Sequence, residues 1–405
     1  MFGCFFMKKV IRISTAIIAV ICSIIMAFVI IGCSTLPDTF VKYEESPQRL
    51  NTFYSLNTNI SSEQVDYQSA SPKTETLLVF GIVPVKSVKV SVKHSPRVYV
   101  SGEVFGIKLY TDGVIIVGTQ EVELDGGKKA SPAAEAGLEK GDIIVSVNNI
   151  LVFSSNEVMA ILNENNGDSY KIRIKRDGRY KTFTLTPVYS SREGTYKAGM
   201  WVRDSTAGIG TLTFYNENYG TFASLGHQIN DIDTNELMPL LEGEAVSATV
   251  TRVQKASAGV TGSLWCDFED YKLGRLLDNS DSGLYGAFVK ISDNAKEYPV
   301  ASKQEVKKGK AQIVCTVSGK KPRTYDIEIT RVTYNREGEQ KDIVFRITDS
   351  VLLKTTGGIV QGMSGSPVIQ NGKLVGAVTH VIVNNPVKGY AIFAETMVEK
   401  SENLN

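Results

Sequence analysis

Histidine and cysteine are scarce in this sequence, with three and five occurrences in 405 residues. No C-x-x-C or H-x-x-x-H spacing occurs among them, and such spacings are typical of zinc sites. We therefore predict no metal site and no cofactor. The scarcity also narrows the search for catalytic groups, because a catalytic imidazole must belong to His94, His227 or His380.

An excess of charge of one sign is also missing. The chain has 44 basic and 43 acidic side chains, for a net charge of +1. No basic stripe stands out, so we expect no nucleic-acid partner. A hydrophobic content of 42% is ordinary for a folded protein. At 405 residues the chain is long enough for two or three domains of roughly 100–200 residues each.

One long apolar run, residues 11–31, follows a basic flank near the N-terminus. About 20 apolar residues can span a bilayer as a helix, and basic flanks stay on the cytoplasmic side. We assign residues 1–33 as a signal or anchor segment that makes the protein membrane-associated, and we expect the rest to be exported. The end of the run resembles a bacterial lipoprotein cleavage box at Cys33. An anchor, a cleaved signal and a lipidated Cys33 all remain open.

Residues 34–76 are polar and lack periodicity, which predicts a linker. Cys266 and Cys315 are the only cysteines beyond Cys33. They could pair in an oxidising compartment or remain buried free thiols.

Residues 77–190 read as a β-rich module with two helices. From Ser131 the order S-P-A-x-x-A-G-L-x-x-G-D-x-I-x-x-V-N is similar to that of PDZ domains. PDZ domains bind a peptide C-terminus by adding it to a sheet edge. The resemblance implies that Phe105, Gly106, Ile107 and Lys108 form the carboxylate-binding loop. A PDZ fold used only as a spacer is the alternative.

Residues 194–405 contain many short β segments separated by Gly, Asn and Asp turns, a texture that favours a sandwich or barrel. Near the end, Ser364 lies between Gly362 and Gly365. A serine in a tight glycine loop can present its hydroxyl beside converging backbone N–H groups, as acyl transfer requires. A glycine-rich hairpin turn with incidental serines is the alternative.

The pattern G-x-S-G-x-P resembles the nucleophile loop of chymotrypsin-like serine peptidases. The resemblance implies a chymotrypsin-like double β-barrel, so we expect a mainly β chain with a PDZ domain followed by this peptidase domain. It also implies that Ser364 is the nucleophile and that the N–H groups of Gly362 and Ser364 form the oxyanion hole.

A serine nucleophile needs a histidine base. His227 follows an apolar strand and precedes Ser364, which is the chymotrypsin-like order, so we predict that it is the base. His380, with Thr379, lies where these enzymes line the substrate pocket, and we expect both to bind substrate. The acid that orients the base stays undecided from the residues alone. The candidates are Asp231, Asp233, Asp267, Asp270, Asp342 and Asp349.

Several longer stretches resemble the stage IV sporulation protein B family of serine peptidases. They are residues 78–84, 106–114, 225–229, 358–367, 376–381 and 389–392. The resemblance implies a membrane-associated peptidase with its PDZ domain ahead of the protease domain. It also implies an acidic residue shortly before the serine, which points to Asp349.

Members of that family act during sporulation, in the space between forespore and mother cell. The resemblance implies that the chain cleaves itself and a membrane protein that regulates an intramembrane protease, which leads to activation of a late sigma factor. Two other functions remain open: an exported PDZ scaffold without catalysis, and a quality-control protease of the HtrA type.

Overall fold

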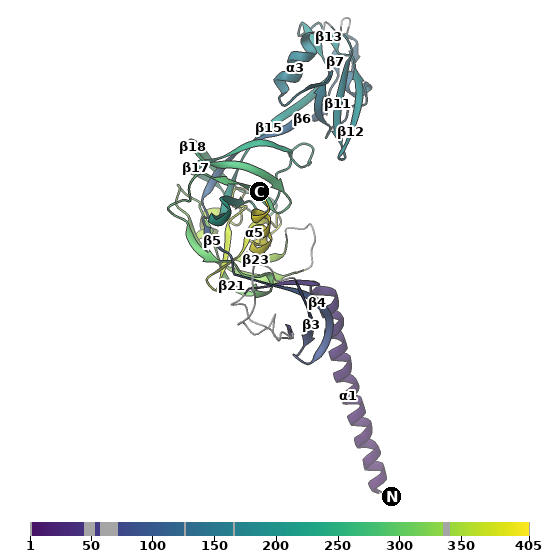
Figure 1. Cartoon of the computed structure of the whole chain (residues 1–405), viewed down its shortest axis with the longest axis vertical. Coiled ribbons are helices and arrows are strands. Elements are labelled where there is room, and N and C mark those ends of the chain that lie inside the picture. Colours follow the sequence, from purple (N-terminus) through teal and green to yellow (C-terminus); the bar gives the residue numbers. More distant parts are fainter. Residues whose placement is uncertain are drawn as a thin grey trace.

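The computed structural model describes residues 2–43, 53–56, 72–124, 127–164, 167–334 and 341–404. The chain is mainly β, as predicted, and its parts follow one another along a line (Figure 1). A PDZ domain lies at one end, a β-barrel body lies in the middle, and an N-terminal helix projects from the other side of the body.

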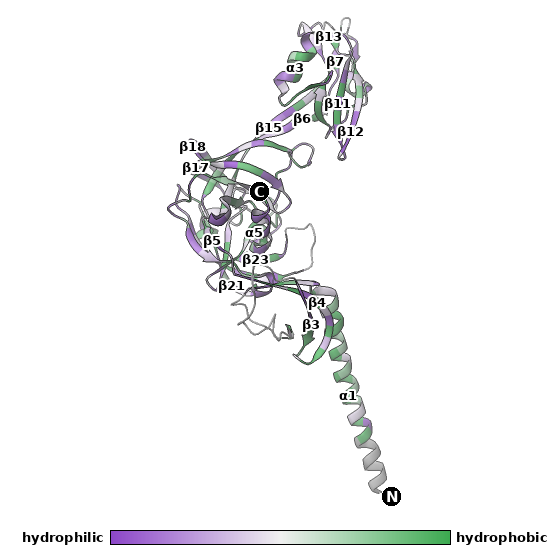
Figure 2. Cartoon of the chain, in the orientation of Figure 1, coloured by the Kyte–Doolittle hydropathy of each residue, from purple (hydrophilic) through white to green (hydrophobic). Residues whose placement is uncertain are grey.

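The N-terminal helix α1 (Phe2–Thr35) contains a 25-residue stretch, Ile11–Thr35, that is long and apolar enough to cross a membrane. A signal sequence would pass the same test. Figure 2 shows the stretch Ile11–Thr35 mostly in green, as an apolar rod that extends away from the body. Phe28 on this helix packs against the rings of Phe53 and Phe80, with centroids 4.9 and 5.2 Å away.

A four-stranded sheet follows the helix, in the order β1-β4-β3-β2. Its strands are β1 (Thr39–Tyr43), β2 (Tyr54–Leu56), β3 (Lys73–Val79) and β4 (Val83–Lys93). The prediction of a linker over residues 34–76 is therefore wrong where the structure describes that segment. Its strands are short, and alternate side chains such as Phe40, Tyr54 and Leu77 meet in one small core with Leu36. A core assembled from separate short pieces leaves little periodicity in the sequence.

The first barrel is a ring of strands in the order β6-β17-β18-β19-β16-β15, closed by pairing of β15 with β6. The strands are β6 (Val104–Thr119), β15 (Met200–Asn216), β16 (Thr221–Ser224), β17 (Leu240–Gln254), β18 (Ser263–Ser280) and β19 (Gly283–Phe288). Two short strands, β5 (Arg97–Val100) and β20 (Lys296–Pro299), extend the sheet beyond β15. Short 3-10 turns occupy Glu217–Tyr219 and Lys303–Glu305.

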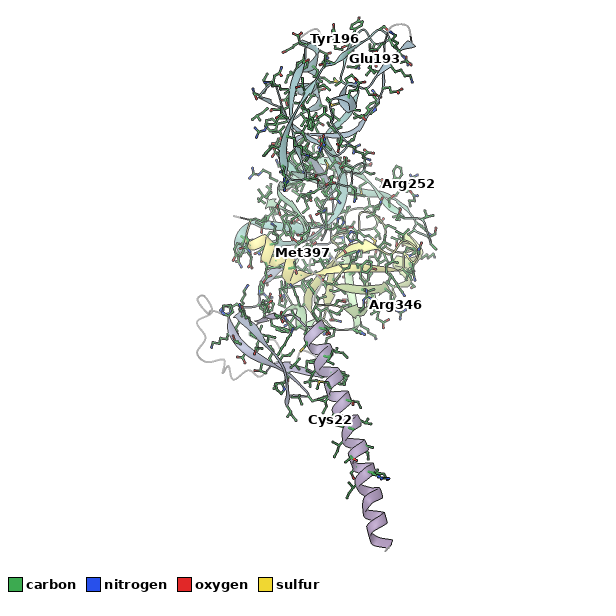
Figure 3. All side chains as sticks on the ribbon, turned by 90° about the vertical axis from the view of Figure 1, so that its right-hand side faces the viewer. Cys22, Glu193, Tyr196, Arg252, Arg346 and Met397 are labelled. Atoms are coloured by element: carbon green, nitrogen blue, oxygen red, sulfur yellow. The ribbon has the colours of Figure 1, made fainter. Side chains whose placement is uncertain are left out.

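The second barrel is closed in the order β21-β22-β23-β26-β25-β24. Its strands are β21 (Gly309–Cys315), β22 (Arg323–Val332), β23 (Ile343–Ile347), β24 (Pro367–Gln370), β25 (Lys373–Val381) and β26 (Lys388–Phe393). Helix α4 (Ser350–Thr356) follows β23, and helix α5 (Ala394–Glu402) packs its buried Met397 into the body (Figure 3). The two barrels confirm the predicted fold class. Cys266 and Cys315 are both free thiols.

The PDZ domain is inserted into the first barrel rather than placed ahead of it. Strand β6 passes from the barrel into the PDZ domain, and β15 returns from the PDZ domain into the barrel (Figure 1). The PDZ elements between them are β7 (Val122–Glu123), β8 (Lys129–Ala130), α2 (Pro132–Glu135), β9 (Ile143–Val147), β10 (Ile150–Leu151), α3 (Ser155–Glu164), β11 (Tyr170–Arg176), β12 (Arg179–Leu185), β13 (Val188–Ser190) and β14 (Thr195–Lys197).

The predicted domain boundaries, 77–190 and 194–405, therefore differ from the strand pairing. Residues 77–93 belong to the sheet beside α1, and residues 104–111 belong to the first barrel. Strand β6 is 16 residues long and crosses the boundary between the two domains. Apolar residues recur on both sides of that boundary, so the sequence gives no mark of the change of domain.

A buried ion pair stabilises the PDZ domain. Asp142 is 1% exposed and receives two bonds from the Arg176 guanidinium, at 2.5 and 2.6 Å. Arg176 also donates to the carbonyl of Gly137 at 2.9 Å. The pairing joins the turn before β9 to the end of β11.

We expect Asp142→Ala to destabilise the PDZ domain by about 3 kcal/mol, because it leaves the Arg176 charge without its buried partner. Hydrogen exchange of the β9 and β11 amides in increasing urea would measure the change. Glu139→Ala is the matched control, since Glu139 also pairs with Arg176 but its side chain is 66% exposed. A control as destabilising as Asp142→Ala would contradict the assignment.

Candidate active site

A cleft of about 520 Å³ lies between the two barrels. The first barrel contributes residues 206–209 of β15 and residues 227–230 after β16. The second contributes residues 359–362, Ser364 and residues 379–381. The cleft therefore brings together Ser364, Gly362, His227, Thr379 and His380, five of the residues singled out from the sequence.

The loop that carries Ser364 is attached to strand β15 of the other barrel. Thr211 N–H donates to the Ser364 carbonyl at 2.8 Å, and Thr211 Oγ1 donates to the Gly362 carbonyl at 2.7 Å. Thr213 Oγ1 donates to the Gly365 carbonyl at 2.7 Å. A Cβ at Gly365, where φ is +92°, would collide with the carbonyl of Thr211, so only glycine fits.

Sequence reasoning missed the two threonines. Both are fully buried on a strand whose neighbours are aliphatic and aromatic. Buried hydroxyls need hydrogen-bond partners, and here those partners lie about 150 residues further along the chain. The signal available in the sequence was a pair of polar residues, Thr211 and Thr213, at alternate positions among apolar residues of a predicted strand.

The backbone of the serine loop contains two amides that have no acceptor among the described residues. Met363, Gly365 and Ser366 donate their N–H groups to the carbonyls of Val360, Val378 and Met363. Within the described ranges, no hydrogen bond uses the N–H of Gly362 or Ser364. These are the two amides expected to form an oxyanion hole, and Gly362 has a φ of +96° that favours glycine.

The Ser364 hydroxyl donates to the main-chain carbonyl of Thr379 on β25, at 2.8 Å. Thr379 is 2% exposed and lies beside His380. The hydroxyl is thus held on the second barrel in this conformation, and this hydrogen bond does not go to His227. A rotation about the Ser364 Cα–Cβ bond would be needed to direct it elsewhere.

His227 is presented by two successive residues in left-handed conformation, Leu225 at φ +64° and Gly226 at φ +69°. Its Nδ1 lies 2.8 Å from the main-chain carbonyl of Gln228. A carbonyl can only accept, so this contact places the proton on Nδ1 and leaves Nε2 with its lone pair. That is the tautomer a general base requires. Burial lowers the pKa of His227, and the Gln228 carbonyl opposes that shift only in part.

A second imidazole lies against the first. The rings of His227 and His380 are 4.9 Å apart between centroids and tilted by 37°. Desolvation, with smaller contributions from His227 and Lys341, lowers the pKa of His380 to about 4, while part of the side chain stays exposed. Both histidines are therefore neutral near pH 7, and neither places a positive charge beside the other.

Asp349 lies outside the cleft. Its Oδ1 accepts the N–H groups of Val351 and Leu352, both at 2.9 Å, so Asp349 is the N-cap of α4. The other carboxyl oxygen lies 3.5 Å from the N–H of Asp326. None of these contacts involves His227, so they do not support the predicted role of Asp349 as the orienting acid, which stays a prediction. A capping aspartate and a catalytic aspartate look alike in one sequence.

The predicted carboxylate-binding loop is also wrong. Phe105, Gly106, Ile107 and Lys108 lie in β6, which pairs with β15 on one side and β17 on the other. Phe105 and Ile107 are buried in the first barrel's core, and Ile107 also lines the cleft. Both edges of this segment are occupied, so it cannot accept a peptide as an added strand.

Comparisons with known proteins match the PDZ domain and the region that contains most of the two barrels. A family described as SpoIVB peptidase S55 matches residues 194–398, and a PDZ domain family matches residues 125–176. Two curated relatives are candidate zinc metalloproteases. The one from Clostridium acetobutylicum is 36% identical over 17% of this chain and 21% of its own length. The one from Lactococcus lactis is 28% identical over 26% of this chain and 23% of its own.

This chain thus spans less than a quarter of the length of either curated relative. Among solved structures, the PDZ domain of an SdrC-like protein from Listeria monocytogenes is 25% identical, covering 22% of this chain and 87% of its own, with a TM-score of 0.19. Within the part of the chain described, no three His, Cys, Asp or Glu side chains gather as metal ligands would.

The lowered pKa of His227 leads to a prediction on pH. A base works in its neutral form, so a pKa below the usual 6.5 extends activity toward acid. We expect kcat/KM for peptide cleavage to fall only below pH 6.5, measured as an initial-rate profile from pH 4 to 9. A half-maximal point at pH 7 or above would mean that a carboxylate raises the pKa of the base, which contradicts the arrangement described.

Two substitutions of Asp349 distinguish a helix N-cap from a catalytic acid. Asparagine caps a helix about as well as aspartate, whereas alanine costs about 1 kcal/mol. We expect Asp349→Asn to retain kcat within about threefold and Asp349→Ala to lower the unfolding free energy by that amount. An orienting acid replaced by asparagine would instead cost about 10⁴-fold in kcat. Steady-state kinetics and urea unfolding of both variants distinguish the two roles.

Proposed function

Because the chain belongs to the SpoIVB peptidase S55 family, we propose that it is a serine endopeptidase with Ser364 as nucleophile and His227 as base. The observation that carries the proposal is the meeting of these two residues in one cleft, from two different barrels and 137 positions apart in sequence. The free Nε2 of His227 and the two undirected amides of the serine loop are the other parts that acyl transfer requires.

In the proposed reaction, Nε2 of His227 takes the proton of the Ser364 hydroxyl as its oxygen attacks the peptide carbonyl. The N–H groups of Gly362 and Ser364 stabilise the oxyanion that forms. His227 then gives the proton to the leaving amine, and an acyl-enzyme remains on Ser364. Water, deprotonated by the same imidazole, hydrolyses the ester. The Gln228 carbonyl keeps the Nδ1 proton in place throughout.

The hydrogen bond from Ser364 to Thr379 suggests how substrate engages the nucleophile. A substrate strand that pairs with the end of β25 would donate an N–H to the Thr379 carbonyl. That donor would compete with the Ser364 hydroxyl and free it to turn toward His227. Thr379 and His380 would then both contact substrate, with His380 beside the base.

The substrates we propose are those of the family: the chain itself, and a membrane protein that regulates an intramembrane protease. Cleavage of the latter would take place in the space between forespore and mother cell and lead to activation of a late sigma factor. The apolar N-terminal helix supports a location at a membrane. Cys33 lies within α1 and its side chain is exposed, so its lipidation stays open.

The direct test is cleavage by the full chain in detergent micelles, of itself and of reduced casein. We expect Ser364→Ala and His227→Ala to lower kcat by about 10⁴-fold or more. Ser257→Ala and His94→Ala are matched controls outside the cleft and should keep full activity. Cleavage that continues in Ser364→Ala would refute the proposal. If the unmutated chain cleaves neither itself nor casein, the non-catalytic PDZ scaffold is favoured instead.

His380 should behave differently from His227. Since it contacts substrate rather than the reacting proton, His380→Gln should raise KM about tenfold and leave kcat within about threefold. Initial rates over a range of peptide concentrations measure both quantities. A loss of kcat as large as that of His227→Ala would mean that His380 takes part in the chemical step.

A further inference from the structure

Strand β15 has a long edge that is not paired. Its first twelve residues, from Met200 to Thr211, pair with β6 along one edge. Along the other edge, residues 200–210 pair with no strand in the described part of the chain. Pairing on that side begins only at Leu212, with β16. An exposed strand edge is a ready template for another strand.

The polar groups of this edge can be located from two hydrogen bonds. Gly199 accepts from Gln120 N–H at 2.9 Å on the β6 side, so by alternation Met200 and Val202 direct their N–H and C=O groups to the open edge. At the other end, Thr211 N–H points away from β6 to Ser364. The same alternation directs the N–H and C=O groups of Ala207 and Ile209 to the open edge. Even-numbered residues face this edge at one end and odd-numbered residues at the other, and the register shift after Arg203 accounts for the change.

In the PDZ domain this edge lies beside helix α3. The N–H and hydroxyl of Ser155, at the start of α3, donate to Asp204 at 2.7 and 2.6 Å. Near the other end of the helix, Thr195 Oγ1 donates to Asn163 at 2.8 Å. The helix therefore runs antiparallel to residues 195–204. A strand beside a helix is where PDZ domains add an extended peptide.

Apolar side chains accompany this edge. Met200 and Val202 pack against the PDZ core, while Met159 on α3 and Trp201 on β15 are 55% and 60% exposed. The turn before β15 contains Gly199 at φ +68°, and a Cβ there would lie 2.7 Å from the Gln120 carbonyl. A backbone turn at the start of the accepting strand is how such domains hold a terminal carboxylate.

The other end of the same edge belongs to the catalytic cleft. Residues 206–209 line it together with Ser364 and His227. One strand, β15, therefore leads without a break from the PDZ domain into the barrel body (Figure 1). From Met200 to Ile209 it covers nine residue steps, or about 30 Å at roughly 3.3 Å per residue.

We propose that an extended C-terminal segment of a protein substrate pairs along this edge of β15, with its last residue at the Gly199 turn and its scissile bond at Ser364. The inference rests on the proposed peptidase function. It specifies a substrate with a free carboxyl terminus and an apolar last residue, cleaved about 8–10 residues from its end. The PDZ domain then measures the distance to the cut, and the leaving fragment is the segment bound along β15.

The test is a peptide series with one cleavable sequence, chosen from the cuts made in reduced casein, followed by uncharged spacers of 3 to 16 residues and a terminal valine. We expect kcat/KM to peak at about 8–10 residues, about tenfold above the shortest peptide. Replacing the terminal carboxylate by an amide should remove the peak. A rate that is independent of both length and amidation, and abolished by Ser364→Ala, would overturn this inference and leave the peptidase function intact.

Variants of the turn supply the matched comparison. Gly199→Ala should lower the rate for acid peptides to that for amides. Gly178→Ala should not, because Gly178 has a similar φ of +73° in the same domain but no atom near its Cβ and no place beside β15. Equal effects of the two changes would show a loss of folding rather than of binding, and would overturn the assignment of the turn.

Binding can be read without catalysis in the full-length Ser364→Ala chain. A peptide with a benzophenone side chain nine residues before a free C-terminus should crosslink to residues 206–209 or 359–364. The amide form should crosslink there at least fivefold less. Crosslinking confined to other parts of the chain would overturn the inference whether or not the parent chain cleaves peptides.

Discussion

The antiparallel pairing of β6 with β15 is the constraint on which the rest of the structure depends. It closes the first barrel, and its extension carries the PDZ domain. On the far side of the same strand, Thr211 and Thr213 hold the loop of Ser364. A displacement of β15 would therefore move the PDZ domain, the wall of the cleft and the loop of Ser364 together. Packed elements of this kind transmit shifts because interiors are dense.

The electrostatics of the site depend on main-chain dipoles more than on charged side chains. The tautomer of His227 is set by a carbonyl, the Ser364 hydroxyl is held by a carbonyl, and two amides of the serine loop have no acceptor among the described residues. Main-chain groups are rigid and keep their polarity at every pH. Desolvation then lowers the pKa values of both histidines, so that the imidazoles stay neutral. The proposed base is thus held in its neutral form.

Helix α4 links the second barrel to the same loop. Asp349 caps its start, and Thr356 at its end donates to the carbonyls of Leu352 and Gly358. Gly357 and Gly358 then lead into the segment that lines the cleft. An acidic residue shortly before the serine can thus matter to the site through the helix it begins, without touching the base.

Local patterns in the sequence predicted much of this protein correctly. The apolar N-terminal run, the PDZ signature from Ser131, the β texture of the last two hundred residues and the glycine loop of Ser364 are all short-range features. Each is specified by neighbours within about twenty residues, and each is present in the structure. The placement of Ser364, His227, Thr379 and His380 in one cleft agrees with the motifs that singled them out.

The features that only the tertiary structure decided depend on contacts between residues far apart in the sequence. The role expected of residues 105–108 failed because β6 acquires two neighbours from distant segments, β15 and β17. The insertion of the PDZ domain is invisible in an unbroken strand pattern. The contacts of Asp349 and the buried bonds of Thr211 and Thr213 likewise depend on which strands meet. Strands pair through backbone N–H and C=O groups, which nearly all residues share. A single sequence therefore shows where a strand lies more readily than which other strand it pairs with.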